Sequence, residues 1–414
     1  MTAADLPDAD RAQTRDALFD LLCCAPGDHA PALDLSADQW HWIETTAKDH
    51  RLLPLLHAIA GRDGTNEWPA FMLERCERAR RSQSRRWLAQ QAAMLAITDS
   101  FARAGISHVY LKGATLALSA YPEGSLRPLR DLDILVAGPR AQQAQDLLKG
   151  LGYAGLPGSA ETTPLDYYQL PALRHRKSGI LVELHRSLAQ PELYDSGPLA
   201  QTLLETAQPH KVAGIDLPLA EPSALHCHLL LHAGIKSHFD CGPLVLADLA
   251  FLRARNAGRE DGFAAAAARF GLERSDALFA RLLAKHGADT HGSAVPASAP
   301  VSAPVPEGLI DHASTLLVEP SQGIRERKIV RDLRTDRPAA HKILALAKSA
   351  LQPNRAKIAA TTGLSVHSRW IGLGYPVWLA DRALLMLRGS ANRRLAKGVD
   401  ADLRLGAWLR NAGE

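Results

Sequence analysis

The chain has 414 residues, of which 46% are hydrophobic, 22% charged and 5% aromatic, and its formal net charge is +4. This length and composition predict a soluble protein with a large core and two or three domains. The low aromatic content gives no strong signal for nucleic-acid binding by base stacking. We find no apolar run of membrane-spanning length, and the start of the chain lacks the basic and apolar regions of a secretory signal.

Hydrophobic periodicity and composition divide the chain into five predicted segments. The pattern predicts a helical N-terminal region, a core with strand signals, a second helical region, a linker or loop rich in Pro, Ala and Ser, and a basic helical C-terminal region. These segments cover residues 1–100, 101–197, 198–290, 291–306 and 307–414. Five cysteines without the spacing of a disulfide framework favour a reducing, cytoplasmic setting.

The first strand signal is the apolar run 106–111, which is followed by Lys112-Gly113-Ala114 and by a helix expected to begin near Thr115. Gly113 permits close approach of the backbone, and the start of a helix attracts anions. Lys112 adds a formal positive charge. The turn therefore predicts nucleotide binding through the phosphates, with Lys112, Gly113 and Ala114 as contacts.

Two carboxylates follow in the strand-like run 131–136. Alternate side chains of a strand share a face, so Asp131 and Asp133 are expected to point together while the apolar residues face the core. A divalent cation relieves the repulsion between them, and Mg²⁺ prefers carboxylate, water and phosphate oxygens. Arg127 and Arg130 precede the pair and are candidate phosphate contacts.

A second apolar strand signal at 179–185 carries Glu183 and His185 on one face. If this strand lies beside the one with Asp131 and Asp133, three acids converge. That number is enough to bind two metals or to combine metal binding with a general base. His185 is better suited to an orienting role than to that of a nucleophile.

Simpler interpretations exist for each of these residues. An Asp-x-Asp pair alone is usually a solvated strand end, and Arg127 and Arg130 are also compatible with ordinary surface cations. The combination of the Lys-Gly turn, the two arginines and Glu183 favours a nucleotide and metal site.

Together these motifs resemble the nucleotidyltransferase fold of the DNA polymerase beta superfamily, in particular its group of uncharacterised nucleotidyltransferase-like proteins. The resemblance covers approximately residues 45–255. It rests on a Lys-Gly turn, a Tyr-Pro pair, an Arg-Pro pair, an Asp-x-Asp strand and an acidic-x-His strand. In this chain they are Lys112-Gly113, Tyr121-Pro122, Arg127-Pro128, Asp131-Leu132-Asp133 and Glu183-Leu184-His185.

The resemblance implies an α+β fold, in which a nucleotidyltransferase core with a small mixed β-sheet is embedded in predominantly helical N- and C-terminal regions. It implies that Asp131 and Asp133 ligate Mg²⁺ or Mn²⁺ and that Glu183 is the third acid. Ala114 stands where the superfamily commonly has serine, so this turn lacks a hydroxyl contact. Members of the group are associated with bacterial biosynthetic clusters for modified peptides and polysaccharides.

The expected reaction is attack by an acceptor hydroxyl or phosphate oxygen on the α-phosphate of a nucleoside triphosphate, with release of pyrophosphate. A peptide, a sugar or lipid intermediate and a protein side chain all remain open as acceptor. One alternative is transfer of a sugar from a nucleotide sugar on the same scaffold. A second is a non-catalytic nucleotide-binding or scaffold protein, which the absence of a serine hydroxyl in the turn would permit.

A His- and Cys-rich segment raises zinc binding as a further alternative. Two of its histidines, His228 and His232, share a helical face, which is a spacing that can chelate zinc. The segment is also rich in leucine, and packed helices are the favoured interpretation. The residues concerned are His226, Cys227, His228, His232, His238 and Cys241.

The positive charge is concentrated near the C-terminus. Residues 307–414 contain 18 Lys/Arg and 10 Asp/Glu, whereas residues 1–306 contain 30 and 34. The basic run 325–337 could meet an anionic partner, but its interspersed acids favour a solvated helix with internal ion pairs. The apolar run 371–387 is interrupted by charges and favours a buried or interface helix, with peripheral membrane contact as a minor alternative.

Overall fold

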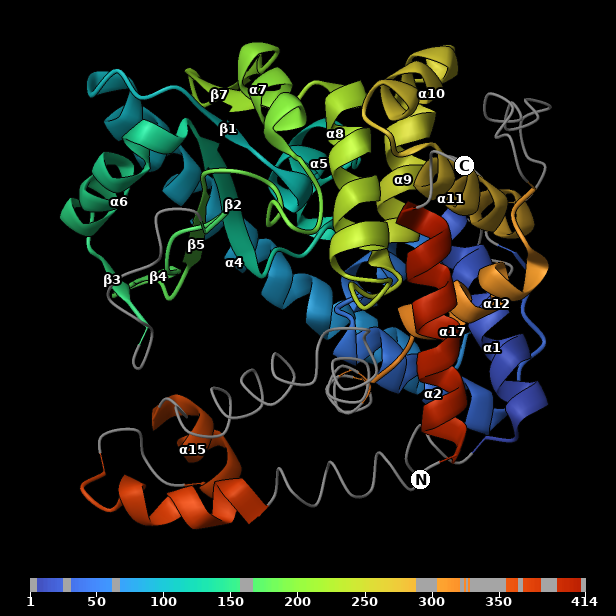
Figure 1. Cartoon of the computed structure of the whole chain (residues 1–414). Coiled ribbons are helices and arrows are strands. Elements are labelled where there is room, and N and C mark those ends of the chain that lie inside the picture. The colour runs from blue at the N-terminus through green and yellow to red at the C-terminus, as the bar shows by residue number, and fades with distance from the viewer. Residues whose placement is uncertain are drawn as a thin grey trace.

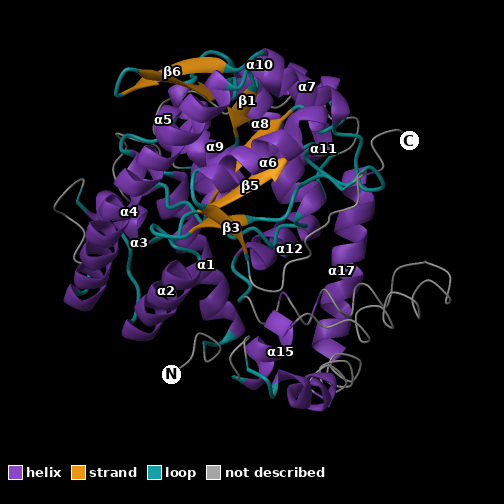
Figure 2. Ribbon diagram, turned by 90° about the vertical axis from the view of Figure 1, so that its left-hand side faces the viewer, coloured by secondary structure: helices purple, strands orange, loops and turns teal. Residues whose placement is uncertain are grey.

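The computed structural model contains a seven-stranded mixed sheet around which helices pack (Figures 1 and 2). The strands occur in the order β3-β4-β5-β2-β1-β7-β6. Their bounds are β1 His108–Tyr110, β2 Asp131–Val136, β3 Tyr153–Gly155, β4 Leu173–His175, β5 Leu181–His185, β6 Gln208–Val212 and β7 Ile215–Leu219. The structure describes residues 6–24, 31–61, 68–156, 167–287, 304–320, 324, 327, 355–363, 368–380 and 393–410.

Helices precede and follow the sheet in the sequence, which confirms the predicted fold class. The helices before and within the sheet are α1 Asp8–Cys23, α2 Ala37–Asp49, α3 Leu53–Ala60, α4 Ala70–Arg103, α5 Lys112–Ser119, α6 Ala141–Gly150 and α7 Gly197–Glu205. Those after it are α8 Pro222–Leu230, a π-helix Leu231–Lys236, α9 Leu244–Arg255, α10 Glu260–Arg269, α11 Glu273–His286, α12 Glu307–Leu317, α15 Arg355–Thr362 and α17 Arg393–Arg410.

The first predicted strand and helix differ from the structure at their boundary. Strand β1 covers only three residues of the run 106–111, and α5 begins at Lys112 rather than near Thr115. The reason is local, because Lys112 has a φ of 44° and turns the chain directly after β1. Ala114 N then donates to Leu111 O over 3.2 Å, which closes the first turn of the helix.

The sheet packs on one core with the long helix α4 and with α6. Met94 and Phe101 from α4 and Leu148 from α6 are fully buried against strand residues such as Ile134 and Val182. The alternation of β2 explains this packing, since its apolar side chains reach the core on one face. Its acidic side chains are left on the other face.

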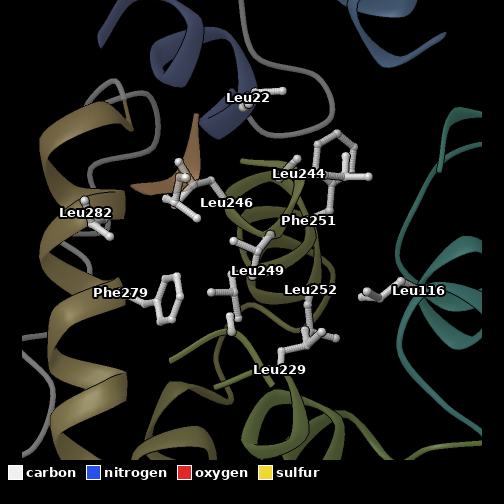
Figure 3. Close-up of a cluster of buried hydrophobic side chains, with 14 of the residues drawn as sticks. Leu22, Leu116, Leu229, Leu244, Leu246, Leu249, Phe251, Leu252, Phe279 and Leu282 are labelled. Atoms are coloured by element: carbon white, nitrogen blue, oxygen red, sulfur yellow. The ribbon is translucent and has the colours of Figure 1, made fainter. Parts of the chain in front are cut away.

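A second core joins helices from distant parts of the sequence. Leu22 of α1, Leu116 of α5, Leu249 of α9 and Phe279 of α11 belong to one buried cluster (Figure 3). Helices before the predicted core and after it therefore share one interior. The domain boundaries expected at residues 100, 197 and 290 stay a prediction.

The C-terminal helices close one side of this second core. Helix α17 packs against α12 and the π-helix (Figure 1). From the predicted basic run, the structure describes Arg327, which forms ion pairs with Glu319 at 3.1 Å and Asp402 at 3.3 Å. The other arginines and lysines of that run lie outside the described residues, as do residues 291–303 of the predicted linker.

The apolar run 371–387 is described as far as residue 380. Ile371 and Trp378 are buried, whereas Leu373 and Val377 are 68% and 55% exposed. Across the described parts of the chain, no helix has both the length and the hydrophobicity required to cross a membrane.

Candidate active site

The acidic side chains meet because β2 and β5 are parallel neighbours. In their register Asp133 lies opposite Glu183, and Leu135 lies opposite His185. The two strands therefore present Asp133 and Glu183 side by side, with Asp131 two residues earlier on the face of Asp133. From the sequence, the acids were expected to converge only if these two strands were neighbours, and in the structure the strands are neighbours.

Asp133 is the most strongly held of these carboxylates. Its Oδ1 accepts hydrogen bonds from Lys112 Nζ at 2.9 Å and from His185 Nε2 at 2.7 Å. Burial opposes ionisation of this carboxyl, but Lys112 and His185 outweigh it and hold the pKa of Asp133 well below its usual value. Burial lowers the pKa of Lys112, but Asp133 raises it by more, so the net change is upward. The ammonium group and the carboxylate are therefore both charged at neutral pH.

The other two acids are in the opposite electrostatic situation. Burial, followed by repulsion from Asp133 and Asp131, raises the pKa of Glu183 to about 7. Burial and Asp133 also raise the pKa of Asp131. A cation bound between these groups would remove the repulsion, which is the physical property expected of a metal site.

The arrangement that could hold a metal ion consists of Asp133, Glu183 and His185. Within the described residues this is the one group of three or more His, Cys, Asp and Glu residues whose ligand atoms all lie within 4.8 Å of one another. Burial lowers the pKa of His185, so its ring is neutral. It can donate Nε2–H to Asp133 or, with the proton on Nδ1, offer the same nitrogen to a metal.

This set differs in one member from the predicted ligands Asp131, Asp133 and Glu183. His185, predicted as an orienting residue, joins the group through the alternation Glu-x-His, which was the sequence signal for it. Asp131 lies outside the group but lines the same pocket as Asp133 and Glu183. A ligand role for Asp131 stays a prediction.

A cavity of about 640 Å³ opens in front of the acids. Predicted residues Lys112, Gly113, Arg127, Arg130, Asp131, Asp133 and Glu183 line it, whereas Ala114 is buried and does not. Sequence reasoning missed several other lining residues, because they come from distant segments and carry no local motif. These include His50, Arg51, Tyr168, His232, Lys236, Asp240 and Asp248.

Gly113 is required by the packing of the protein itself. A Cβ atom at this position would lie 2.6 Å from Leu129 Cδ2 and 2.9 Å from Arg127 Nη1. Both distances are too short for a side chain to be tolerated unless the Leu129 and Arg127 side chains of the loop before β2 move. The glycine therefore lets the loop before β2 approach the start of α5, where no described side chain caps the helix.

Arg127 is anchored by a residue of α9, which is distant from it in the sequence. Its Nε and Nη2 donate to Asp248 Oδ1 and Oδ2 of α9, each at 2.7 Å, and Nη1 donates to Pro128 O at 2.9 Å. Tyr121 OH also donates to Asp248, at 2.8 Å. The structure thus shows Arg127 as a partly buried link between the loop before β2 and α9. Its predicted contact with phosphate would have to use the remaining N–H groups.

Arg130 lies on the exposed rim of the cavity together with Arg51 and His50. Arg51 has a φ of 61° in the connection between α2 and α3, so the N-terminal helices contribute directly to this wall. Burial and the neighbouring Arg130 lower the pKa of Arg51. This rim is rich in positive charge.

The His- and Cys-rich segment 226–241 provides no ligand group of its own in the part of the chain that the structure describes. His226 Nε2 hydrogen-bonds Asp276 Oδ1 at 2.8 Å. Burial, reinforced by Lys112, lowers the pKa of both His228 and His232 well below the usual value. The segment forms packed helices, which was the favoured interpretation.

A second cavity of about 440 Å³ adjoins the first and shares Tyr168 with it. Its walls are mainly rings and small side chains, with a few polar groups. They are formed by Gly138, Pro139, Gln142, Tyr167, Tyr168, Arg186, Ser187, Ala189 and Pro191.

The structure thus combines a mixed sheet, carboxylates on adjacent parallel strands and a lysine at the start of a neighbouring helix, which is the arrangement expected of a nucleotidyltransferase. The family model described as an uncharacterised nucleotidyltransferase matches residues 36–287, and the chain belongs to this family. The match is wider than the resemblance seen in the sequence motifs. Comparison with curated proteins gives no match. Nucleotidyltransferases generally use divalent metals, and the buried Asp133–Glu183–His185 group has the donor atoms to bind one.

Proposed function

We propose that this protein transfers a nucleoside monophosphate from a nucleoside triphosphate to an acceptor, with Mg²⁺ or Mn²⁺ bound at the acidic group. The observation that supports this proposal most is the register that sets Asp133 opposite Glu183 in a cavity lined by Lys112. Membership of a nucleotidyltransferase family supports the same reaction class. Carboxylates that repel one another beside phosphate-binding cations are suited to this chemistry.

In this proposal Asp131, Asp133 and Glu183 hold the metal, and His185 orients Asp133 through their hydrogen bond. When bound, the cation neutralises the carboxylates and the phosphate oxygens. Lys112, the start of α5 and Arg130 bind the triphosphate, and Arg127 keeps the β2 loop in place through Asp248.

The bond changes are those of a single displacement. An acceptor oxygen forms a bond to the α-phosphorus, and the bond from that phosphorus to the pyrophosphate oxygen breaks. As an alternative to ligating the metal, Glu183 takes the proton of an acceptor hydroxyl as a general base. Electrostatic stabilisation by the cations then favours the charge that develops on the phosphoryl oxygens.

The acceptor is a peptide, a sugar or lipid intermediate, or a protein side chain. The second cavity offers it a place, since it adjoins the acidic site at Tyr168. We further propose a cytoplasmic role in bacterial biosynthesis of modified peptides or polysaccharides, which the five free cysteines and the motif resemblance support.

A screen of the four nucleoside triphosphates and of UDP-sugars with Mg²⁺ or Mn²⁺ tests the function. Intact-mass analysis of candidate acceptors should show the mass of a nucleoside monophosphate, together with released pyrophosphate. The mass of a hexose would instead select sugar transfer. Metal-dependent nucleotide binding without pyrophosphate release would select a non-catalytic protein, in keeping with the missing hydroxyl at Ala114.

A further inference from the structure

Lys236 extends into the cavity from the last residue of the π-helix. Its Nζ lies 4.2 Å from the centroid of the Tyr168 ring, and both residues line the cavity with Lys112 and Glu183. The side chain therefore lies at the acidic site, although it is far from the sequence motifs that predicted that site.

Lys236 differs from the other cations of the cavity in having no direct ion pair with a described residue. Lys112 is paired with Asp133 at 2.9 Å, and Arg127 with Asp248 at 2.7 Å. Lys236 has the contact with the Tyr168 ring, but it forms no hydrogen bond or ion pair with a described residue. A ring face attracts a cation without accepting its three N–H bonds in the way an oxygen does.

The enclosed position of Lys236 makes this arrangement costly. Burial, followed by repulsion from Lys112, lowers the pKa of Lys236 to about 8. A desolvated ammonium group is stabilised when an anion supplies the missing acceptors. Among the described residues Asp133, Glu183 and Asp131 attract this charge from a distance, but none of them accepts a hydrogen bond from it.

The backbone around Lys236 fixes its position. Gly234 faces α11 so closely that a Cβ atom there would lie 2.9 Å from Ser275 Oγ. After the π-helix, Ser237 N donates to His232 O at 2.9 Å, and Phe239 N donates to Ala233 O at 2.8 Å. π-Helical turns are rare and are often found at functional sites. Such a constrained turn is suited to presenting one side chain to a ligand.

We propose that Lys236, supported by the ring of Tyr168, is an oxyanion-binding residue that contacts a phosphate group in the cavity. The phosphate belongs either to the triphosphate or to an anionic acceptor, and the chemistry recognised is the same. The inference rests on the proposed function for the identity of these substrates. Binding of inorganic pyrophosphate, which requires no turnover, tests Lys236 separately from that function.

Calorimetric titration of pyrophosphate with Mg²⁺ into the full chain provides the first test. Lys236→Met should weaken pyrophosphate binding about tenfold or more, because a charge-assisted hydrogen bond is lost. Lys236→Arg should retain most of the affinity. Tyr168→Leu should weaken binding about threefold through loss of the supporting ring. The matched control is Lys211→Met on the exposed strand β6, which should bind as the wild type does.

Two further titrations distinguish the sources of the phosphate. Weaker binding of an α,β-methylene nucleoside triphosphate with Mg²⁺ to Lys236→Met assigns the residue to the triphosphate. Unchanged nucleotide binding, with loss of inorganic phosphate binding to the nucleotide-loaded protein, assigns it to an anionic acceptor.

Equal affinity of wild type and Lys236→Met for all three probes overturns the inference, as does a wild type that binds none of them. Circular dichroism of each variant shows whether a loss of affinity comes from misfolding. If Lys236→Met is misfolded, the comparison of Lys236→Arg and Tyr168→Leu decides in its place. A wild type that binds pyrophosphate through Lys236 but never releases it from a triphosphate would refute the proposed function and leave the inference standing.

Discussion

Asp131 and Asp133 look equivalent in the sequence but have different surroundings in the fold. Asp133 is 6% exposed and hydrogen-bonded to Lys112 and His185. Asp131 is the first residue of β2, and its pKa is raised. Asp133 is therefore both a candidate metal ligand and the counter-ion of Lys112. Asp131 forms no hydrogen bond or ion pair with a described residue that would give it such a structural role.

Substitution of each aspartate by asparagine should separate these roles. We expect both Asp131→Asn and Asp133→Asn to abolish metal-dependent turnover. Asp133→Asn should also lower the free energy of unfolding by about 3 kcal/mol, because Lys112 loses its buried counter-ion. Asp131→Asn should leave stability within about 0.5 kcal/mol of the wild type. Urea unfolding and a pyrophosphate-release assay measure both effects, and full activity of either variant would reject its metal role.

His108 provides a pH-dependent contribution to stability away from the site. Burial lowers its pKa to about 4 from the ordinary 6.5, although a backbone hydrogen bond with Ile106 opposes the change. The unfolded chain thus binds a proton below pH 6.5 that the folded chain does not bind until about pH 4. Stability is lost as the pH falls through this window.

We expect His108 to account for about 2 kcal/mol of the stability lost between pH 7.5 and pH 5, from 1.36 kcal/mol per unit of pKa difference. His108→Asn should be less stable than the wild type at pH 7.5, and this deficit should shrink by that amount at pH 5. Urea unfolding of both proteins at the two pH values measures the change. A deficit that is the same at both values would contradict the assignment.

At the scale of elements, the site depends on how closely α5 approaches the loop before β2. Gly113 makes this approach possible, and the pairing of Arg127 with Asp248 ties the same loop to α9. The turn at Lys112 and Gly113 and the acidic strand β2 are thereby held in one geometry.

Gly113→Ala should therefore destabilise the protein by about 2 kcal/mol through overpacking against Leu129 and Arg127. It should also weaken nucleotide binding, because the loop must move. Gly150→Ala at the end of α6 is the matched control, since a Cβ atom there meets nothing within 4 Å. That variant should be as stable as the wild type or slightly more stable. If the two substitutions had equal effects in thermal unfolding, the packing argument would be wrong.

Local sequence patterns were sufficient to predict which side chains share a face of a single strand. The two-residue alternation of β2 and β5 placed Asp131, Asp133, Glu183 and His185 on shared faces, and family membership confirmed the fold class. The start of α5 was misplaced by three residues because propensity does not reveal that Lys112 adopts a positive φ.

Contacts between distant elements could not be predicted in this way. Asp248 is 121 residues from Arg127, and Lys236 reaches the site only through the turn of a π-helix. Neither has a neighbouring motif, and the register of β2 against β5 is fixed by packing of the whole sheet. The roles assigned to the site residues stay predictions.

At the scale of the whole molecule, the sheet and its acidic site are supported by a core that includes both ends of the described chain. Leu22 near the start and Leu409 near the end belong to the same buried cluster as Leu249. Helix α5, which begins at Lys112, contributes Leu116 to that cluster (Figure 3). Stability of the helical regions and integrity of the site should therefore be coupled.

Leu22→Ala should lower the free energy of unfolding by about 3 kcal/mol, since it opens a cavity in this core. Helical circular dichroism and nucleotide binding should then be lost together at a lower urea concentration. The exposed Leu88 of α4 offers the control, and Leu88→Ala should unfold as the wild type does. Two separate transitions, with only one affected by Leu22→Ala, would show that the helical region folds independently of the site.

The most direct test of the central claim is the Glu183→Gln variant, measured for thermal stability, nucleotide affinity and pyrophosphate release. Glutamine keeps the shape and removes a charge that is repelled by Asp131 and Asp133. We predict a melting temperature at least equal to that of the wild type, retained nucleotide binding and a loss of turnover of about a hundredfold or more. Turnover equal to that of the wild type would contradict a catalytic acidic site built on β2 and β5.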